Sequence, residues 1–99
     1  MILDCTGFEW DRGNSSKNWI KHQISRTECE EVFFNKPLLV VSDTKHSQNE
    51  IRYHALGKTN QDRMLFLAFT VRSDKIRVIS ARDMNRKERS IYAERDSKV

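Results

Sequence analysis

Three strand-like segments joined by very short connections constrain the fold of this chain more than any other feature. The segments are residues 51–58, 63–72 and 75–82, and the middle one, RMLFLAFTVR, is apolar nearly throughout. Only 59–62 (TNQD) and 73–74 (SD) separate them. Such connections can close hairpins but are too short for the crossover that parallel strands need. The sequence therefore predicts an antiparallel meander whose middle strand is covered on both faces.

Shorter segments before the meander predict two more strands and two helices. Residues 38–42 (LLVVS) indicate a strand, and 2–10 can form a short first strand. A helix over 17–23 follows a serine pair that can cap it. A second helix opens at Ser25, where Glu28 completes a capping-box pattern.

The end of the chain predicts a closing helix. Asn85 is its expected cap, and Glu88 stands three residues later. Met84, Ile91 and Tyr92 are expected on its core side. The resulting fold class is α+β, with two N-terminal helices, an antiparallel sheet of four to five strands and a C-terminal helix.

Composition limits the class of protein. Ninety-nine residues suit one domain over 1–99, and 18 basic against 14 acidic residues give a net charge of +4, which favours a polyanionic partner. Cys5 and Cys29 show no metal spacing and no need for an oxidising compartment, so we expect a cytoplasmic protein. We expect no signal peptide, no membrane segment, no metal and no other cofactor.

Alternation along the strands predicts where polar side chains gather. The expected shared faces are Arg52, His54, Leu56 and Lys58; Phe66, Ala68, Thr70 and Arg72; and Val78, Ser80 and Arg82. Antiparallel pairing brings Arg52 and Arg72 toward one sheet edge, whereas Arg82 joins them only if the last strand has a favourable register. Arginines on one patch suit the recognition of phosphate and the stabilisation of charge during phosphoryl transfer.

Such chemistry also needs a proton acceptor. Glu50, His46 and His54 are the nearby candidates. His54 on an alternating strand equally suits a half-buried, hydrogen-bonded histidine, and His46 stands in a polar loop where it need have no role.

The arginines have an ordinary structural interpretation as well. Arg52 and Arg72 suit solvated strand ends that pair with nearby carboxylates, and Arg82 can pair with Asp83 or Glu88. The basic residues that follow are typical of a solvated helix face.

Motifs spread over residues 8–92 resemble the BrnT family, the ribonuclease toxins of type II toxin–antitoxin systems. They are FEWD (8–11), Asn18, KH (21–22), VF (32–33), Pro37, Asp43, His46, EIR (50–52), Gly57, Thr70, Arg72, RVISAR (77–82) and RKERSIY (86–92). One departure is Gln23, which stands where many relatives carry glycine.

The resemblance implies a RelE-like fold, metal-independent cleavage of RNA and arrest of translation. It also implies neutralisation by a BrnA-type antitoxin, usually encoded beside the toxin, with operator DNA bound only through that antitoxin. We further expect that the free toxin can form a homodimer through an uncovered sheet edge.

The resemblance also assigns roles to residues. The family's catalytic positions match Glu50, Arg52, Arg72 and Arg82. The substrate's 2′-hydroxyl would attack the adjacent phosphate, with Glu50, or else His46 or His54, as proton acceptor and the arginines holding the phosphate. Further contacts with RNA are expected from Lys58, Arg77, Arg86 and Arg89. The competing interpretations are a non-catalytic basic module that binds nucleic acid or protein, and a degenerate toxin retained for promoter control.

Overall fold

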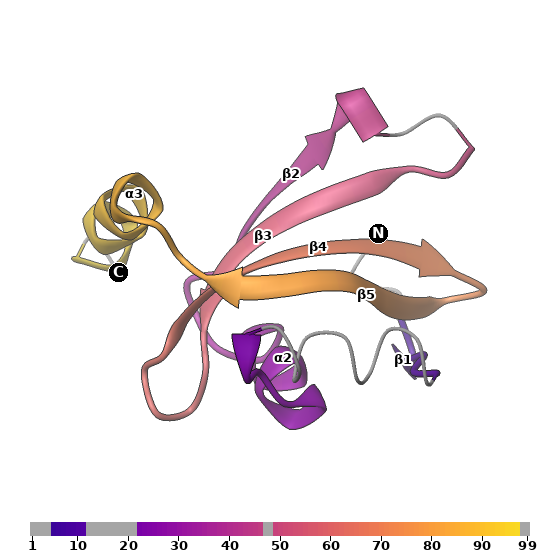
Figure 1. Ribbon diagram of the computed structural model, residues 1–99, viewed down its shortest axis with the longest axis horizontal. Coiled ribbons are helices and arrows are strands. Elements are labelled where there is room, and N and C mark those ends of the chain that lie inside the picture. Colours follow the sequence, from indigo (N-terminus) through magenta and orange to yellow (C-terminus); the bar gives the residue numbers. More distant parts are fainter. Residues whose placement is uncertain (1–4, 12–21, 47–48, 98–99) are drawn as a thin grey trace.

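The computed structural model describes residues 5–11, 22–46 and 49–97 (Figure 1). It contains a five-stranded sheet in the order β1-β5-β4-β3-β2, with α2 against one face and α3 at one end. The elements are β1 (Gly7–Phe8), α2 (Arg26–Val32), β2 (Leu39–Asp43), the short helix η2 (Thr44–His46), β3 (Arg52–Lys58), β4 (Met64–Arg72), β5 (Lys75–Asp83) and α3 (Arg86–Ser97).

The predicted meander is confirmed, and its last hairpin is tight. β3, β4 and β5 pair antiparallel, and β2 pairs antiparallel with β3. Ser73 and Asp74, which connect β4 to β5, have φ angles of 48° and 66°. Two successive positive φ values are those of a type I′ turn, whose twist matches that of the flanking strands.

The prediction of a wholly antiparallel sheet is wrong at β1, which runs parallel to β5. The backbone N–H of Thr6 donates to Asp74 O at 2.7 Å, and that of Glu9 donates to Ile76 O at 2.9 Å. The strand expected over 2–10 is limited to Gly7–Phe8 among the described residues, and 1–4 lie outside them. The sheet is therefore mixed, because β1 lies parallel to β5 at the edge of the sheet opposite β2.

Of the two predicted N-terminal helices, the described residues show one, α2. Its capping box is confirmed: Ser25 Oγ accepts from Glu28 N at 3.1 Å, and Glu28 Oε1 accepts from Ser25 N at 2.9 Å. The helix expected over 17–23 lies mainly outside the described residues. Gln23, the last residue of that range, has a φ of 55°, so the helix cannot include it; this left-handed conformation favours glycine.

The core lies between α2 and the sheet. Cys29 and Val32 of α2 are buried with Leu65, Leu67 and Phe69 of β4, as the apolar pattern indicates. At Gly57 the helix approaches β3 so closely that a Cβ would lie 2.5 Å from Val32 Cγ1. The absence of a side chain at Gly57 therefore sets the spacing between helix and sheet.

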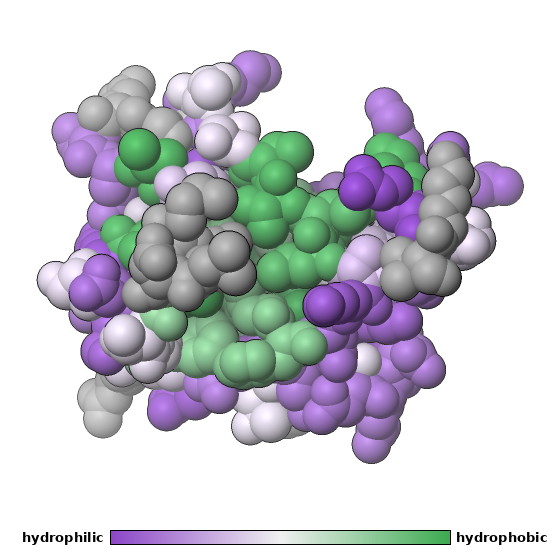
Figure 2. Space-filling view, turned by 180° about the vertical axis from the view of Figure 1, so that it is seen from behind, coloured by the Kyte–Doolittle hydropathy of each residue, from purple (hydrophilic) through white to green (hydrophobic). Residues whose placement is uncertain are grey.

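The predicted closing helix is also confirmed, with one correction. Asn85 and Glu88 form its capping box: Asn85 Oδ1 accepts from Glu88 N at 2.8 Å, and Glu88 Oε1 accepts from Asn85 N at 2.9 Å. Met84 and Tyr92 are buried, but Ile91, expected on the core side, is 46% exposed. Figure 2 shows that apolar residues gather across the middle of the face seen there, with hydrophilic residues around them.

A bulge changes the phase of β5. Ala68 pairs with Ser80, but Phe69 pairs with Val78, which leaves Ile79 as the extra residue. Val78 is therefore buried in the core, and its predicted place beside Ser80 and Arg82 is wrong. No helix among the described residues is long and apolar enough to cross a membrane.

Candidate functional site

The face of the sheet opposite α2, called the outer face below, carries most of the candidate residues. Register places them in rows that cross four strands: Leu39, Leu56, Phe66 and Arg82; Val41, His54, Ala68 and Ser80; and Asp43, Arg52, Thr70 and Arg77. Because of the bulge, Arg77 shares this face with Arg82. Alternation along β3 and β4 places Arg52, His54 and Arg72 on this surface, and the register of β5 places Arg82 there as well.

His54 and Asp43 form a hydrogen-bonded pair on the outer face. His54 Nε2 lies 2.9 Å from Asp43 Oδ2, and the two side chains are 36% and 10% exposed. The His54 ring also packs against Phe66, with ring centroids 4.9 Å apart. Two contacts therefore fix the orientation of an imidazole that solvent can still reach.

Arg82 contacts the same aromatic ring. Its Cζ lies 4.1 Å from the Phe66 centroid. Its Nη1 and Nη2 donate to Glu88 Oε1 and Oε2 at 2.8 and 2.9 Å, and Nη1 also donates to Asp83 O at 3.1 Å. These hydrogen bonds raise the pKa of Arg82 and lower that of Glu88. Among the described residues, the hydrogen bonds of Arg82 use Nη1 and Nη2. The Nε–Nη2 edge of a guanidinium is a two-donor fork that fits a phosphate.

A second pair lies at the far end of the outer face. Arg72 Nε and Nη2 donate to Glu50 Oε2 and Oε1 at 2.9 and 3.1 Å. The hydrogen bonds from Arg72 lower the pKa of the Glu50 carboxyl, and the charge of Arg52 lowers it further. Glu50 is therefore a weaker proton acceptor than an ordinary glutamate. The ion pairs that the structural interpretation allowed for Arg72 and Arg82 are both present.

The structure does not bring all the arginines together. Arg82 lies opposite Phe66, and Arg72 follows Phe66 by six residues on β4, which corresponds to about 20 Å of strand. Arg52 lies between these ends, opposite Asp43 and Thr70. One phosphate cannot contact Arg72 and Arg82 at once, although one RNA strand can cross both.

The remaining candidates are scattered around these pairs. Lys58 Nζ lies 3.5 Å from Asp96 Oδ2 of α3. Arg77 donates to Glu9 and Asp11 at 3.2 and 2.6 Å. Arg89 donates to Met84 O at 2.8 Å, and Arg86 is exposed at the start of α3. His46 belongs to η2, and its side chain lies outside the described part of the chain.

Sequence reasoning did not assign Asp43 and Phe66 to the site. Asp43 is the last residue of β2, and its register opposite Arg52 brings it next to His54. In the sequence, Asp43 was an acid at the end of an apolar strand and one of the residues that carry the family resemblance, but neither signal assigned it a role. Within residues 5–11, 22–46 and 49–97, no three histidine, cysteine or carboxylate side chains are grouped as a metal site requires.

Fold and outer face together define a small α+β protein with a basic sheet surface that holds a histidine–aspartate pair. The sequence profile of the family described as "Ribonuclease toxin, BrnT, of type II toxin-antitoxin system" matches residues 10–88. The chain belongs to this family. A search of curated proteins found no match.

Proposed function

We propose that this toxin is a metal-independent endoribonuclease whose cleavage site lies at His54, Asp43, Phe66 and Arg82. The observation that supports this most is that an oriented imidazole and a partly exposed guanidinium contact the same ring. In this mechanism the substrate's own 2′-hydroxyl attacks the adjacent phosphate. The bond from phosphorus to the 5′-oxygen breaks and that oxygen takes a proton from solvent, so the products carry a 2′,3′-cyclic phosphate and a 5′-hydroxyl.

His54 is the proposed proton acceptor. A neutral imidazole that donates from Nε2 to Asp43 keeps Nδ1 as an acceptor for the 2′-hydroxyl proton. Asp43 fixes that tautomer and stabilises the imidazolium that forms. Glu50 is less suited, because both its oxygens accept hydrogen bonds from Arg72 and its pKa is lowered.

Arg82 is the proposed ligand of the reacting phosphate. Its Nε–Nη2 edge can donate to two non-bridging oxygens, where charge increases in the transition state. Arg52, two residues from His54 on the same face, is proposed to support it. Arg72, with Lys58, Arg77, Arg86 and Arg89, would bind neighbouring phosphates and so contribute to affinity rather than to the chemical step.

The biological setting follows from the family. A type II toxin acts with an antitoxin, and we propose a BrnA-type protein encoded beside the toxin gene. In this proposal the toxin cleaves RNA in the cytoplasm and arrests translation until the antitoxin binds. Operator DNA is then contacted through the antitoxin.

Incubation of the purified protein with single-stranded RNA in EDTA tests the proposal. We expect cleavage that leaves cyclic phosphate ends, with kcat about 10²–10⁴-fold lower in His54→Gln and about 10²–10³-fold lower in Arg82→Ala. Arg72→Ala should mainly raise KM, and Lys87→Ala, an exposed cation on α3, is the matched control. Binding of RNA without cleavage would favour the non-catalytic module, and full activity in folded His54→Gln would reject His54 as the proton acceptor.

A further inference from the structure

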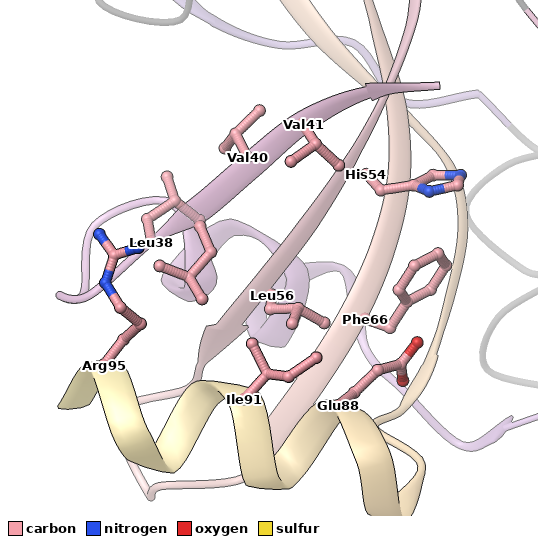
Figure 3. A pocket seen from close by; sticks show the side chains of 10 residues that line it. Leu38, Val40, Val41, His54, Leu56, Phe66, Glu88, Ile91 and Arg95 are labelled. Atoms are coloured by element: carbon pink, nitrogen blue, oxygen red, sulfur yellow. The ribbon is translucent and has the colours of Figure 1, made fainter. Parts of the chain in front are cut away.

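A groove of about 570 Å³ runs between α3 and the β2–β3 side of the sheet (Figure 3). Leu56 of β3 and Ile91 of α3 point into it from opposite sides. Its walls are fixed, because the buried Tyr92 donates its hydroxyl to Pro37 O at 2.7 Å and so anchors α3 to the segment before β2. The groove is therefore a formed feature of the fold.

The lining favours a polypeptide over a nucleobase. Six of the ten lining residues are aliphatic, and the aromatic and arginine side chains, on which proteins mainly bind unstacked bases, stand at its two ends: Phe66 and His54 at one, Arg95 at the other. Four consecutive residues, 38–41, line the groove. Side chains alternate between faces along a strand, so a hollow that touches all four must follow the strand's edge.

That edge is the end of the sheet. β2 is the terminal strand, with no further strand beside it among the described residues. Val41 of β2 is 64% exposed and Ile91 is 46% exposed. An edge strand that borders an apolar groove is the arrangement in which a partner adds an extended segment through backbone hydrogen bonds and inserts alternate side chains.

Charge indicates what the segment carries. Arg95 of α3 stands beside Leu38 at one end of the groove, and the chain has a net charge of +4. A carboxylate on the bound segment would complement this cation. At the other end lie His54, Phe66 and Glu88, which belong to the proposed cleavage site or hold Arg82 in place.

We propose that the antitoxin of this system neutralises the toxin by placing an extended, apolar segment with an acidic residue along β2 and in this groove. Its apolar side chains occupy the space between Leu56 and Ile91, and its carboxylate pairs with Arg95. Because the groove ends at His54 and Glu88, the bound segment also covers the place where RNA would reach Arg82. The blocking of cleavage rests on the proposed function, whereas the docking surface does not.

The test measures affinity for the purified antitoxin encoded beside the toxin gene, by calorimetry, with the full-length toxin. Ile91→Glu and Val41→Glu place a charge in the groove. Each should weaken binding about 30-fold or more, a loss typical of a buried interface anchor. Ile51→Glu is the matched control, because Ile51 is 58% exposed outside the groove. Arg95→Glu should weaken binding about tenfold and reduce its dependence on salt.

A second measurement keeps the result interpretable if a variant is poorly folded. Hydrogen exchange of the unsubstituted toxin should show new protection of β2 amides when the antitoxin binds. Groove variants that bind as tightly as the parent, equal weakening by Ile51→Glu, or no protection in β2 would each overturn the docking proposal. If the parent binds its antitoxin in this groove yet cleaves no RNA, the proposed function fails while the docking surface stands.

Discussion

Gly57 and Val32 should form a strongly coupled pair in the core. Gly57→Ala adds a Cβ that would lie 2.5 Å from Val32 Cγ1 and 3.3 Å from Val32 O. Relieving that overlap requires α2 to move away from the sheet, so we expect the free energy of unfolding to fall by about 2 kcal/mol, within the usual range for overpacking. Val32→Ala deletes two fully buried methyl groups and should cost about 2.5 kcal/mol through lost burial and a cavity.

The double variant separates this explanation from a general weakening. With the γ-carbons of Val32 removed, the new Cβ at Gly57 occupies the space that they leave. We therefore expect the double variant to lose about 3 kcal/mol, against about 4.5 kcal/mol for independent sites. Urea unfolding with an unchanged m-value measures all four proteins. Additive losses would show that the close approach of α2 to β3 does not determine the packing here.

Three further predictions concern single groups. Glu88→Gln keeps an oxygen that accepts from Arg82 and from the α3 cap, whereas Glu88→Ala removes the acceptor for each. The kcat for RNA should therefore fall more in Glu88→Ala than in Glu88→Gln. A fall in kcat at a temperature where Glu88→Ala is still fully folded would show that Glu88 positions Arg82. The pKa of Asp83 is held below its ordinary value by hydrogen bonds from Arg63. The stabilisation that the Asp83 carboxylate provides is therefore present above about pH 4 and lost as the pH falls through its folded-state pKa. The difference in unfolding free energy between the parent and Asp83→Asn should narrow from pH 7 to pH 3, and a constant difference would contradict this. Burial raises the pKa of the Cys29 thiol to about 12, so Cys29 should react with a thiol reagent at pH 8 only after unfolding, and rapid labelling in the native protein would refute its burial.

Local patterns predicted much of the fold. The strands of the meander are recognisable because their connections are short and their apolar residues continuous. The starts of α2 and α3 are recognisable because Ser25 with Glu28 and Asn85 with Glu88 form capping boxes within three residues of sequence. These features depend on neighbouring residues alone, which explains why no tertiary information was needed.

Features that depend on distant pairing were not predictable. Nothing in residues 2–10 indicates that Gly7 and Phe8 pair parallel with β5. The bulge at Ile79 has no sequence signal, since no glycine or proline marks it, yet it moves Val78 into the core and Arg77 to the outer face. Alternation alone gave the correct faces for β3 and β4 and failed where the bulge interrupted the period of two.

The candidate site shows the same limit. Alternation left open whether Arg82 joins Arg72 on one face, and only register shows that they share it and lie at its opposite ends. Asp43 becomes the partner of His54 because β2 pairs with β3 in one register, and a shift by one residue would turn Asp43 toward α2.

The Arg82–Glu88 pair links the proposed chemistry to the position of α3. Glu88 accepts from the Asn85 backbone and from both terminal nitrogens of Arg82, so the first turn of the helix and the guanidinium share one carboxylate. A shift of α3 would therefore disturb either the Arg82–Glu88 hydrogen bonds or the contact of Arg82 with the Phe66 ring. Ile91 and Arg95 of the same helix line the groove. A segment that occupies the groove would therefore contact the helix whose Glu88 holds Arg82. In the docking proposal, a segment in the groove would therefore act on Arg82 through the helix turn that joins Ile91 to Glu88.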